Sequence, residues 1–453
     1  MRCCVIGQKF KGIDPMSNSL ARSKRHFEKL SKSDATHLVW RMGFGASQED
    51  VDAAQKDGLQ VVLDRCVPRE PTDVPEESPE FKETEPLLRL TALDSDNIAQ
   101  LKAWWLFRMR YSNQPVLERI SLLWHNHFAT SNAKVQSVQH MFAQNQLIRK
   151  HAMGSFRSLL HGMAKDVAML LWLDSNSNRK RQANENFSRE IMELFSLGVG
   201  NYTEKDIQEA ARAFTGWHVR NDKFWFNKIQ HDYGTKTVFG KKDNFDGHHI
   251  VDLCLDQPAG ARFIALKLLR EFVTDTPDKE LVESLAVRIR HHNYEMTPVV
   301  RELFASEAFF SEEHRRAIIK SPVQLVMGAY RSLNVRPNLA NSARLIGELG
   351  QNLFEPPSVK GWEGGRLWVN SATMLQRMNF AGRLCSGNQL GQIDATVSKR
   401  ASDAPQVIAQ LLTGSTLPAE AVAEFEKFDI SSSEQEGRRI LHAIMSLPEF
   451  QLS

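Results

Sequence analysis

Cysteine is scarce in this sequence, and no motif pairs the few that occur. Five cysteines stand among 453 residues, at positions 3, 4, 66, 254 and 385. An odd number of widely spaced cysteines excludes a disulfide framework. The lack of a CxxC pair argues against a structural zinc knuckle. Cys254 lies in the apolar stretch IVDLCL, so we expect its thiol to be buried and unreactive.

The sequence also lacks an excess of charge and a long apolar run. Its 57 basic and 54 acidic residues give a net charge of +3, too small to indicate a nucleic-acid partner. No apolar stretch approaches the roughly 20 residues of a membrane-spanning helix. Residues 1–30 lack the apolar core of a secretory signal, and we expect them to form a disordered leader. The default expectation is therefore a cytoplasmic location.

Several catalytic fingerprints are missing as well. Neither GxGxxG nor the phosphate loop GxxxxGKS/T occurs, which leaves nucleotide binding without support. The absence of a GxSxG elbow and of HExxH disfavours an α/β-hydrolase and a zinc protease. No Glu-x-x-His lies in the helices that carry the motifs described below, which disfavours ferritin-like di-iron chemistry.

Helical periodicity dominates what is present. Hydrophobic residues make up 42% of the chain and charged residues 25%, as in soluble globular proteins. Apolar residues recur at spacings of three and four, so we predict a mostly α fold. It consists of one large multi-helical domain over residues 31–385, with C-terminal helices at 386–453 packed on it. The Pro- and Glu-rich residues 68–86 predict a surface linker. The main predicted helices cover 98–109, 117–128, 137–151, 156–171, 184–198, 203–218, 259–273, 279–291, 297–305, 321–333 and 339–349.

Residues 219–250 interrupt the helical pattern. KFWFNK alternates aromatic with polar residues, and TKTVFGKK alternates again. Such alternation is typical of half-buried strands. We predict a small β-hairpin or irregular aromatic-rich insertion in an otherwise helical domain.

Five stretches are more specific than their periodicity: HLVWRMGFG (37–45), WHNHFAT (124–130), residues 184–217, HDYGTKTVFG (231–240) and residues 360–380. In this order they resemble the bacterial domain-of-unknown-function 1800 (DUF1800) family. The resemblance implies a helical fold, but no biochemical activity is established for the family. Similar members are often exported and are commonly encoded beside a sulfatase-like protein. The resemblance therefore implies export as the alternative location and a sulfatase-like protein as partner.

The WHNHFAT motif places two histidines at the end of a predicted helix. His127 shares the apolar stripe of that helix, whereas His125 lies about 200° away on a regular helix. The pair can chelate one ion only if the helix ends there. We expect a buried, hydrogen-bonded His127 with a surface or capping His125; the alternative is a pair of metal ligands, or a ligand with a proton carrier.

Three predicted helices bring one ionisable residue each to an apolar face: His127, Glu190 and His218. Two histidines and a carboxylate suit a divalent metal such as zinc or iron. His231 and Asp232 could add a ligand or form a catalytic dyad. The alternative is that such groups form buried hydrogen-bonded pairs that fix helix packing.

The segment KGWEGGRLW combines glycines with tryptophans. Glycine lets backbone approach a ligand closely, and tryptophan rings stack on flat ligands such as sugars. Trp362, Gly364, Gly365, Arg366 and Trp368 are therefore predicted ligand-binding residues. A tight turn packed by Trp362 against the helices is the alternative.

Two functions remain open. The preferred one is a binding or scaffold component that acts with a partner, using the aromatic insertion and the KGWEGG loop. The alternative is a metal-assisted or acid/base enzyme, a hydrolase or an oxidoreductase, in which His127, Glu190 and His218 carry the chemistry. The sequence determines neither the substrate nor the oligomeric state.

Overall fold

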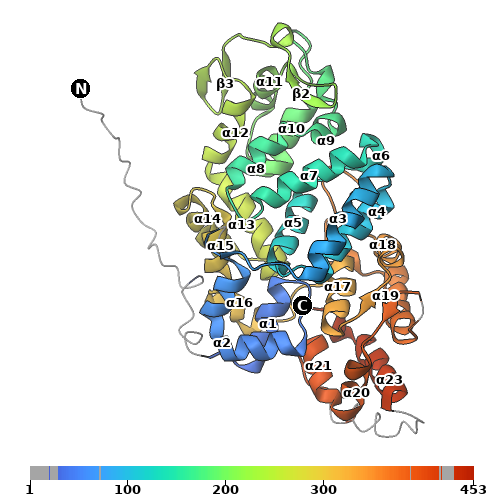
Figure 1. Cartoon of the computed structure of the whole chain (residues 1–453). Helices are drawn as coiled ribbons and strands as arrows, with labels where there is room; N and C mark the ends of the chain where they lie inside the picture. The colour runs from blue at the N-terminus through green and yellow to red at the C-terminus, as the bar shows by residue number, and fades with distance from the viewer. Residues whose placement is uncertain (1–19, 21–28, 71–72, 388, 418–419, 421–432) are drawn as a thin grey trace.

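The computed structural model describes residues 20, 29–70, 73–387, 389–417, 420 and 433–453. The described chain is mostly helical and forms a single domain (Figure 1), which confirms the predicted fold class. Most of the predicted leader at 1–30 lies outside these residues. Within them, no helix combines the length and the apolarity that crossing a membrane requires.

The first half of the chain is built from short helices. They are α1 (Lys32–Met42), α2 (Gln48–Cys66), α3 (Pro79–Asp94), α4 (Ile98–Tyr111), α5 (Pro115–His127), α6 (Asn132–Val135), α7 (Val138–His151), α8 (Phe156–Met163), α9 (Val167–Trp172), α10 (Asn186–Met192), the π-helical segment η5 (Glu193–Leu197) and α11 (Glu204–Ala213).

The second half adds the insertion and the remaining helices. They are β1 (Trp217–Arg220), β2 (Lys223–Phe226), β3 (Lys236–Val238), β4 (Lys241–Asp243), α12 (Gly247–Asp256), α13 (Pro258–Phe272), α14 (Lys279–His291), α15 (Met296–Phe304), α16 (Glu307–Phe310), α17 (Pro322–Ser332), β5 (Arg336–Pro337), α18 (Leu339–Glu348), α19 (Ser371–Cys385), β6 (Gly391–Gln392), α20 (Ala395–Asp403), α21 (Pro405–Thr413) and α23 (Ser433–Met445).

Four predicted boundaries are wrong. Half of the predicted linker 68–86 is helical, because Ser78 caps α3 and a proline is tolerated in its first turn. The predicted helix 156–171 is two helices, since Asp166 caps α9. The predicted helix 184–198 begins two residues later, at Asn186, whose N–H donates to the Asn184 side chain. The predicted helix 203–218 ends at Ala213, so His218 lies on a strand.

The insertion contains two antiparallel hairpins, β1–β2 and β3–β4. The strands begin at Trp217 and end at Asp243, so they do not span the whole of the predicted insertion 219–250. In the first hairpin Trp217 pairs with Phe226 and His218 with Trp225. Trp217 and Phe224 point inward and their rings meet edge to face. Helix α12 begins at Gly247, where a Cβ would lie 2.5 Å from the Trp217 ring. The aromatic residues of the motif therefore attach the insertion to the helices.

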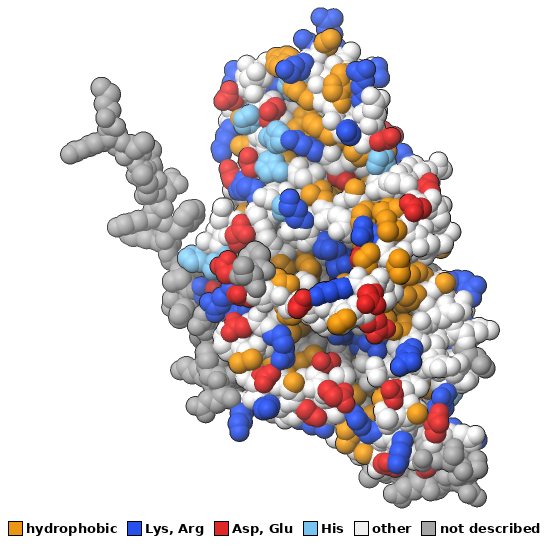
Figure 2. Space-filling view, in the orientation of Figure 1, with side chains coloured by type: hydrophobic (Ala, Val, Ile, Leu, Met, Phe, Trp, Pro, Cys, Tyr) orange, Lys and Arg blue, Asp and Glu red, His pale blue; other side chains and the backbone are white. Residues whose placement is uncertain are grey.

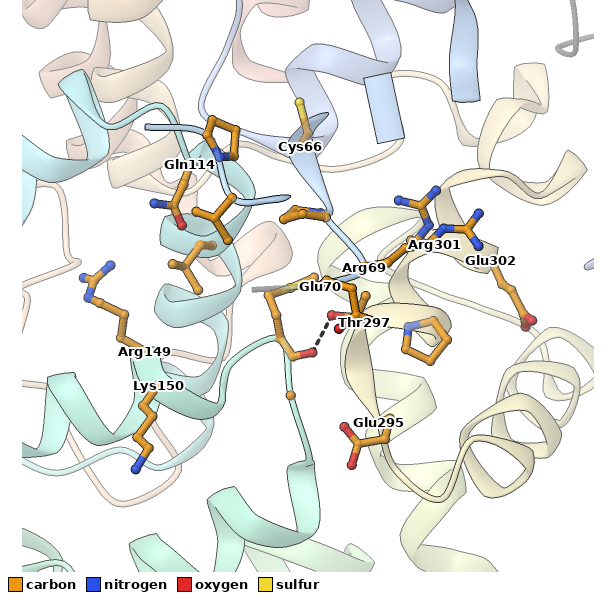
Figure 3. A pocket seen from close by; sticks show the side chains of 17 residues that line it. Cys66, Arg69, Glu70, Gln114, Arg149, Lys150, Glu295, Thr297, Arg301 and Glu302 are labelled. Carbon is orange, nitrogen blue, oxygen red and sulfur yellow. Dashed lines mark hydrogen bonds between the residues drawn. The ribbon is translucent and has the colours of Figure 1, made fainter. Parts of the chain in front are cut away.

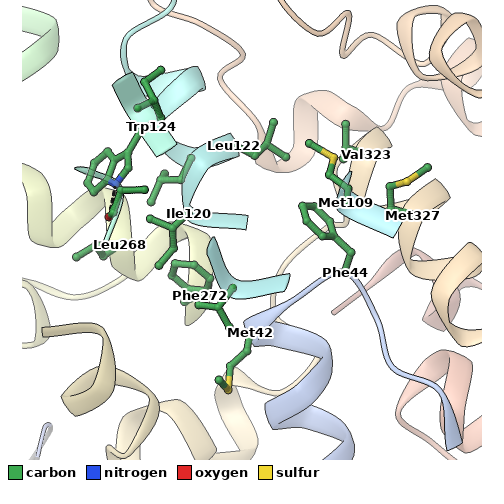
Figure 4. Close-up of a cluster of buried hydrophobic side chains, with 14 of the residues drawn as sticks. Met42, Phe44, Met109, Ile120, Leu122, Trp124, Leu268, Phe272, Val323 and Met327 are labelled. Atoms are coloured by element: carbon green, nitrogen blue, oxygen red, sulfur yellow. Dashed lines mark hydrogen bonds between the residues drawn. The ribbon is translucent and has the colours of Figure 1, made fainter. Parts of the chain in front are cut away.

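Helix α5 runs through the centre of the core. Figure 4 shows Ile120 and Trp124 of α5 on the side of α13, and Leu122 on the side of α17. All three side chains are buried. Its remaining positions are almost all buried too, including polar ones such as Glu118 and His125. A helix buried on every side must satisfy its polar side chains inside the protein.

The buried carboxylate of Glu118 receives its hydrogen bonds from the neighbouring helices. Its Oε1 accepts hydrogen bonds from Arg108 Nε of α4, at 3.0 Å, and from Arg149 Nη1 of α7. Its Oε2 accepts one from Trp105 Nε1 at 3.1 Å. Burial alone would raise the pKa of Glu118, but the charges of Arg149 and Arg108 outweigh burial and hold it below its usual value.

The first and last helices lie together at one end of the molecule, and the insertion lies at the other (Figure 1). Arg41 of α1 donates to the backbone oxygens of Phe272, Val273, His314 and Ser453. The final residues run beside Ile319, which forms a β-bridge with Leu452. The C-terminal segment is thus built into the same domain as α1.

We expect Glu118→Gln to destabilise the fold by roughly 3–5 kcal/mol, because it leaves the buried Arg149 without a carboxylate and Arg108 with only the longer contact to Glu85, at 3.4 Å. Chemical denaturation of the variant and the wild type measures the difference. The matched control is Glu348→Gln, which removes a carboxylate from the exposed pair with Arg344 and should change stability by less than about 1 kcal/mol.

The effect of Glu118→Gln depends on pH in a defined direction. The pKa of Glu118 is lower in the folded state than in the unfolded state. Its contribution to the free energy of unfolding is therefore fully present above the unfolded pKa and is lost as the pH falls through the folded pKa. The difference in unfolding free energy between wild type and variant should therefore become smaller at acidic pH. A gap that stays constant from pH 7 to pH 3 would contradict this assignment.

Candidate functional site

The motif WHNHFAT forms the C-terminal end of α5, and each side chain from 124 to 127 binds the backbone of a different segment. We call these four residues the α5 terminus. Trp124 Nε1 donates to the carbonyl of Ala152, just beyond α7, at 3.0 Å. The other three bind the loop before the KGWEGG segment, that segment itself and η5.

His125 faces the loop that follows α18. Its Nε2 accepts the backbone N–H of Phe354 at 3.2 Å, and its ring packs between those of Trp105 and Phe354. Burial lowers the pKa of His125 to about 3. The histidine is therefore neutral at physiological pH and acts as a hydrogen-bond acceptor in the core, rather than at the surface as the helical spacing predicted.

Asn126 binds the KGWEGG segment through a reciprocal pair of hydrogen bonds. Its Oδ1 accepts the N–H of Trp362 at 2.7 Å, and its Nδ2 donates to the Trp362 carbonyl at 3.0 Å. The chain can come this close because residue 361 is glycine. A Cβ on Gly361 would lie 2.2 Å from Asn126 Oδ1, and its φ of +75° is also a glycine conformation.

His127 binds the π-helical segment η5. Its Nε2 donates to the Phe195 carbonyl at 3.0 Å, and its buried Nδ1 has no hydrogen-bond partner among the described residues. Burial, followed by the charge of Lys267, lowers the pKa of His127 to about 3. The ring is therefore neutral at physiological pH, and its burial and bond to Phe195 confirm the expected buried, hydrogen-bonded His127.

The π-helical segment explains why a histidine is needed there. Carbonyls in the last turn of a helix have no later N–H to bind, and Gly198 ends η5 with φ of +79°. Ser196 Oγ donates to the Ile191 carbonyl at 2.6 Å, and His127 satisfies that of Phe195. π-Helical turns often mark functional sites, but here the donors satisfy the helix itself.

Glu190 is half-buried near the edge of this region. Burial, and next the neighbouring Glu193, raise its pKa, while Arg189 and Lys360 oppose that shift. Arg189 binds Glu204 and Glu185 instead of Glu190. No hydrogen bond joins Glu190 to His127 in the described part of the chain.

His218, His231 and Asp232 also have backbone or ion-pair partners of their own. His218 Nε2 lies 3.1 Å from the Asn178 carbonyl, and His231 Nδ1 lies 2.8 Å from that of Thr215. Asp232 Oδ2 accepts from Arg212 Nε at 2.8 Å. Asp232 therefore binds an arginine rather than His231.

A zinc or iron centre built from these residues requires several of them to converge. Among the residues that the structure describes, no three His, Cys, Asp or Glu side chains are grouped so that they could hold a metal ion. His125, His127 and His218 each direct Nε2 to a backbone group. In this arrangement they do not fit a metal centre, and the roles assigned from the sequence to them, and to Glu190, stay predictions.

The tryptophans of KGWEGGRLW are buried, with 6% of Trp362 and 9% of Trp368 exposed. They pack inside the protein and present no open face for stacking a ligand. Arg366 and Leu367 between them point outward. Gly365 lies against the Asp275 carboxylate, and Gly364 beside the Trp368 ring. The arrangement matches the packed turn that was the alternative for this segment.

A large cleft lies away from the α5 terminus. It has a volume of about 760 Å³ and lies between the end of α2, the start of α5, the end of α7 and α15 (Figure 3). Two of its arginines are already paired, Arg149 with Glu118 and Arg301 with Asp64. No sequence motif pointed to this cleft because its lining comes from four separate segments.

The fold and this region define a mostly α single-domain protein in which the motif side chains join distant segments. A model of the family described as "Protein of unknown function (DUF1800)" matches residues 37–452. The chain therefore belongs to the DUF1800 family, which confirms the resemblance seen in its motifs. No curated protein and no solved structure matches the chain.

The contact between Asn126 and the KGWEGG segment can be tested by two matched substitutions. Gly361→Ala and Gly364→Ala both place a methyl group at φ near +75° to +79°, but the Gly364 Cβ would meet only Trp368 Nε1, at 3.5 Å. Each variant should lose about 1–2 kcal/mol of folding stability, because alanine is strained in the left-handed conformation that glycine adopts there. Gly361→Ala should lose about 1–3 kcal/mol more through overpacking. Equal losses in thermal or chemical unfolding would contradict the close approach.

The neutral His127 predicts a pH dependence of stability. Its folded pKa of about 3 lies below the usual 6.5, so the unfolded state takes up a proton first and stability falls as pH drops below about 6.5. The loss of unfolding free energy caused by His127 is about 1.4 kcal/mol per pH unit. His127→Gln retains a donor for Phe195 and should flatten the slope of unfolding free energy between pH 6 and 4 by that amount. An unchanged slope would mean that His127 is protonated in the fold.

Proposed function

We propose that this protein is a non-catalytic binding component that contacts an acidic partner protein through the outer end of its insertion. The observation that carries the proposal is an exposed apolar pair set among basic side chains. Ile229 is 86% exposed and Trp225 is 38% exposed. We define the tip surface as Trp225, Ile229, Arg179, Lys180, Arg181, Arg220, Lys223 and Lys228.

The hairpin register places Trp225 on the outer face. Neighbouring residues of a strand point to opposite sides, so Phe224 turns toward Trp217 and the helices while Trp225 turns away. Arg220 lies over the Trp225 ring, with its guanidinium carbon 5.0 Å from the ring centroid. An arginine stacked on a half-exposed tryptophan is preorganised for contact, because the ring holds the long side chain in place.

The loop that carries Arg179, Lys180 and Arg181 is fixed beside the hairpin. Lys180 N donates to the Gln230 carbonyl at 2.7 Å, next to the exposed Ile229. The Asn176 side chain also exchanges two hydrogen bonds with the backbone of Val219. Basic residues that are distant in sequence are thereby held around the apolar pair.

The charge of the tip surface favours an acidic partner. No ion pair involving its lysines or arginines is found in the described part of the chain. The neighbouring acid Asp222 lies against His140, at 3.3 Å. Figure 2 shows blue and orange side chains together at this end of the molecule. Tryptophan and arginine are the residues most enriched at the energetic centres of protein interfaces, and complementary charge speeds association.

The alternative, a hydrolase or oxidoreductase built on His127, Glu190 and His218, has no observation in its favour. Both histidines bind backbone carbonyls, and Glu190 bonds to neither of them in the described structure. A sulfatase-like protein encoded beside the gene is the partner to test first, because the family resemblance suggests it.

Binding of that sulfatase-like protein should weaken when the tip surface is changed. We expect Trp225→Ala and Ile229→Ala each to raise Kd by about tenfold, since truncated interface anchors cost more than about 1 kcal/mol. Lys180→Glu with Arg181→Glu should mainly slow association and remove its salt dependence. Surface plasmon resonance with the folded, full chain measures all three.

Two controls make the result specific. Leu375→Ala removes an apolar side chain from α19 that is 60% exposed, between the values for Trp225 and Ile229, and Lys399→Glu reverses an exposed charge on α20. Tip variants that bind as tightly as these controls would refute the proposal. Binding to vesicles of acidic phospholipid, without binding to the protein, would refute the choice of a protein partner.

A further inference from the structure

A small internal cavity lies at the other end of the molecule, where α1, α17 and the C-terminal segment meet. Its volume is about 10 Å³. It is lined by Trp40, Phe44, Gly45, Arg119, Lys320, Gln324, Gly328, Leu412, Phe450 and Ser453. These residues come from five separate parts of the chain, so no sequence motif could reveal the cavity.

Three lining residues carry a hydrogen-bonding atom that is buried and has no partner among the described residues. These atoms are Trp40 Nε1, Arg119 Nη2 and Ser453 Oγ. The Trp40 and Arg119 side chains are more than nine-tenths buried. Arg119 uses its other nitrogens on Glu271 and on the Gly43 carbonyl, so only Nη2 is left. Buried donors without a partner are costly in a fold.

Lys320 adds a cation to the same wall. Its buried Nζ donates to the carbonyls of Phe450, at 2.8 Å, and of Leu412, at 3.4 Å, which uses two of its three hydrogens. The ammonium lies 3.8 Å from the centroid of the Trp40 ring. Arg377, also buried, donates to the Lys320 carbonyl. No carboxylate of the described residues forms an ion pair with Lys320 or Arg377.

The balance of donors and acceptors selects the ligand. Trp40, Arg119 and Lys320 can only donate, the Ser453 hydroxyl can donate or accept, and the Gln324 oxygen already accepts the N–H of Ser321, so donors outnumber free side-chain acceptors in the lining. A water molecule accepts about two hydrogen bonds and must donate its own, whereas a halide accepts from every side. We propose that this cavity binds one small monovalent anion of the size of chloride.

The size of the cavity supports a monatomic ligand. About 10–15 Å³ measured in this way holds a single water-sized particle, which matches the cavity and excludes phosphate or a carboxylic acid. Burial, and then the charge of Arg377, hold the pKa of Lys320 well below its usual value. An anion beside the ammonium favours its charged form.

A larger cleft adjoins the cavity. It has a volume of about 290 Å³, shares Trp40 and Ser453 with the cavity, and is lined by Arg41, Arg315, Arg316 and Glu312. Three arginines against one carboxylate in this lining favour anions in the cleft. Because the cavity walls belong to α1, α17 and the C-terminal segment, an anion held there would stabilise the junction of the first and last parts of the domain.

Thermal unfolding of the full chain in chloride and in gluconate, at equal ionic strength, tests the proposal. A ligand that binds only the folded state raises Tm with its concentration. We expect chloride to raise Tm by an amount on the order of one to two degrees above gluconate, with saturation. Trp40→Phe, which removes Nε1–H and retains the ring over which Lys320 lies, should abolish the difference.

Trp172→Phe is the matched control. Trp172 Nε1 is also buried without a partner among the described residues, and Lys134 lies over its ring, yet it does not line the cavity. This variant should retain the chloride effect. Equal Tm in the two salts, or a chloride effect that persists in Trp40→Phe, would overturn the proposal. In crystals grown in bromide, an anomalous peak beside Trp40 Nε1 would support it, and a peak only elsewhere would overturn it.

Discussion

The nearly complete burial of helix α5 is the constraint on which the rest of the structure depends. A helix without a solvent-exposed face must find an internal partner for each polar group it carries. Glu118 does so with arginines of α4 and α7, and Arg119 does so with Glu271 of α13. Asn126 and His127 do so with the backbone of the KGWEGG loop and of η5. Each of these bonds determines where a neighbouring segment lies, so α5 sets the arrangement of the domain.

Much of the fold was predictable from periodicity and capping. The capping boxes at Ser47 and Thr203 start helices where the spacing of apolar residues begins. The errors arise where tertiary contacts override local preference. His218 continues a helical stripe in sequence, but the chain turns at Gly216, whose φ is +80°, and pairs as a strand instead. The spacing of residues 184–198 cannot distinguish a π-helical turn, since η5 depends on His127 of α5, which donates to its Phe195 carbonyl, and on its own Ser196, which donates to the Ile191 carbonyl of α10.

The motifs were recognisable, but their chemistry was not. A histidine that binds a metal and one that binds a carbonyl look identical in sequence. For His127 the folded structure was needed to show that its ring binds the carbonyl of Phe195. Asn126 escaped notice because an amide aligned with a peptide group has no sequence signature. The aromatic insertion was predicted from the sequence to form a contact surface, and this stays a prediction. Its basic half, around Lys180, comes from a loop some forty residues earlier that only the folded chain brings alongside.

The bonds of Arg41 constrain how the chain can fold during synthesis. Its guanidinium is buried by backbone oxygens that include one 412 residues away, at Ser453. Until that segment has left the ribosome, α1 carries a charge that has no place in a core, so the beginning of the domain must wait for its end. Contacts of such long range slow folding and leave partly formed cores open to association. The N-terminal helices can therefore complete their packing only after residues up to 453 have been synthesised.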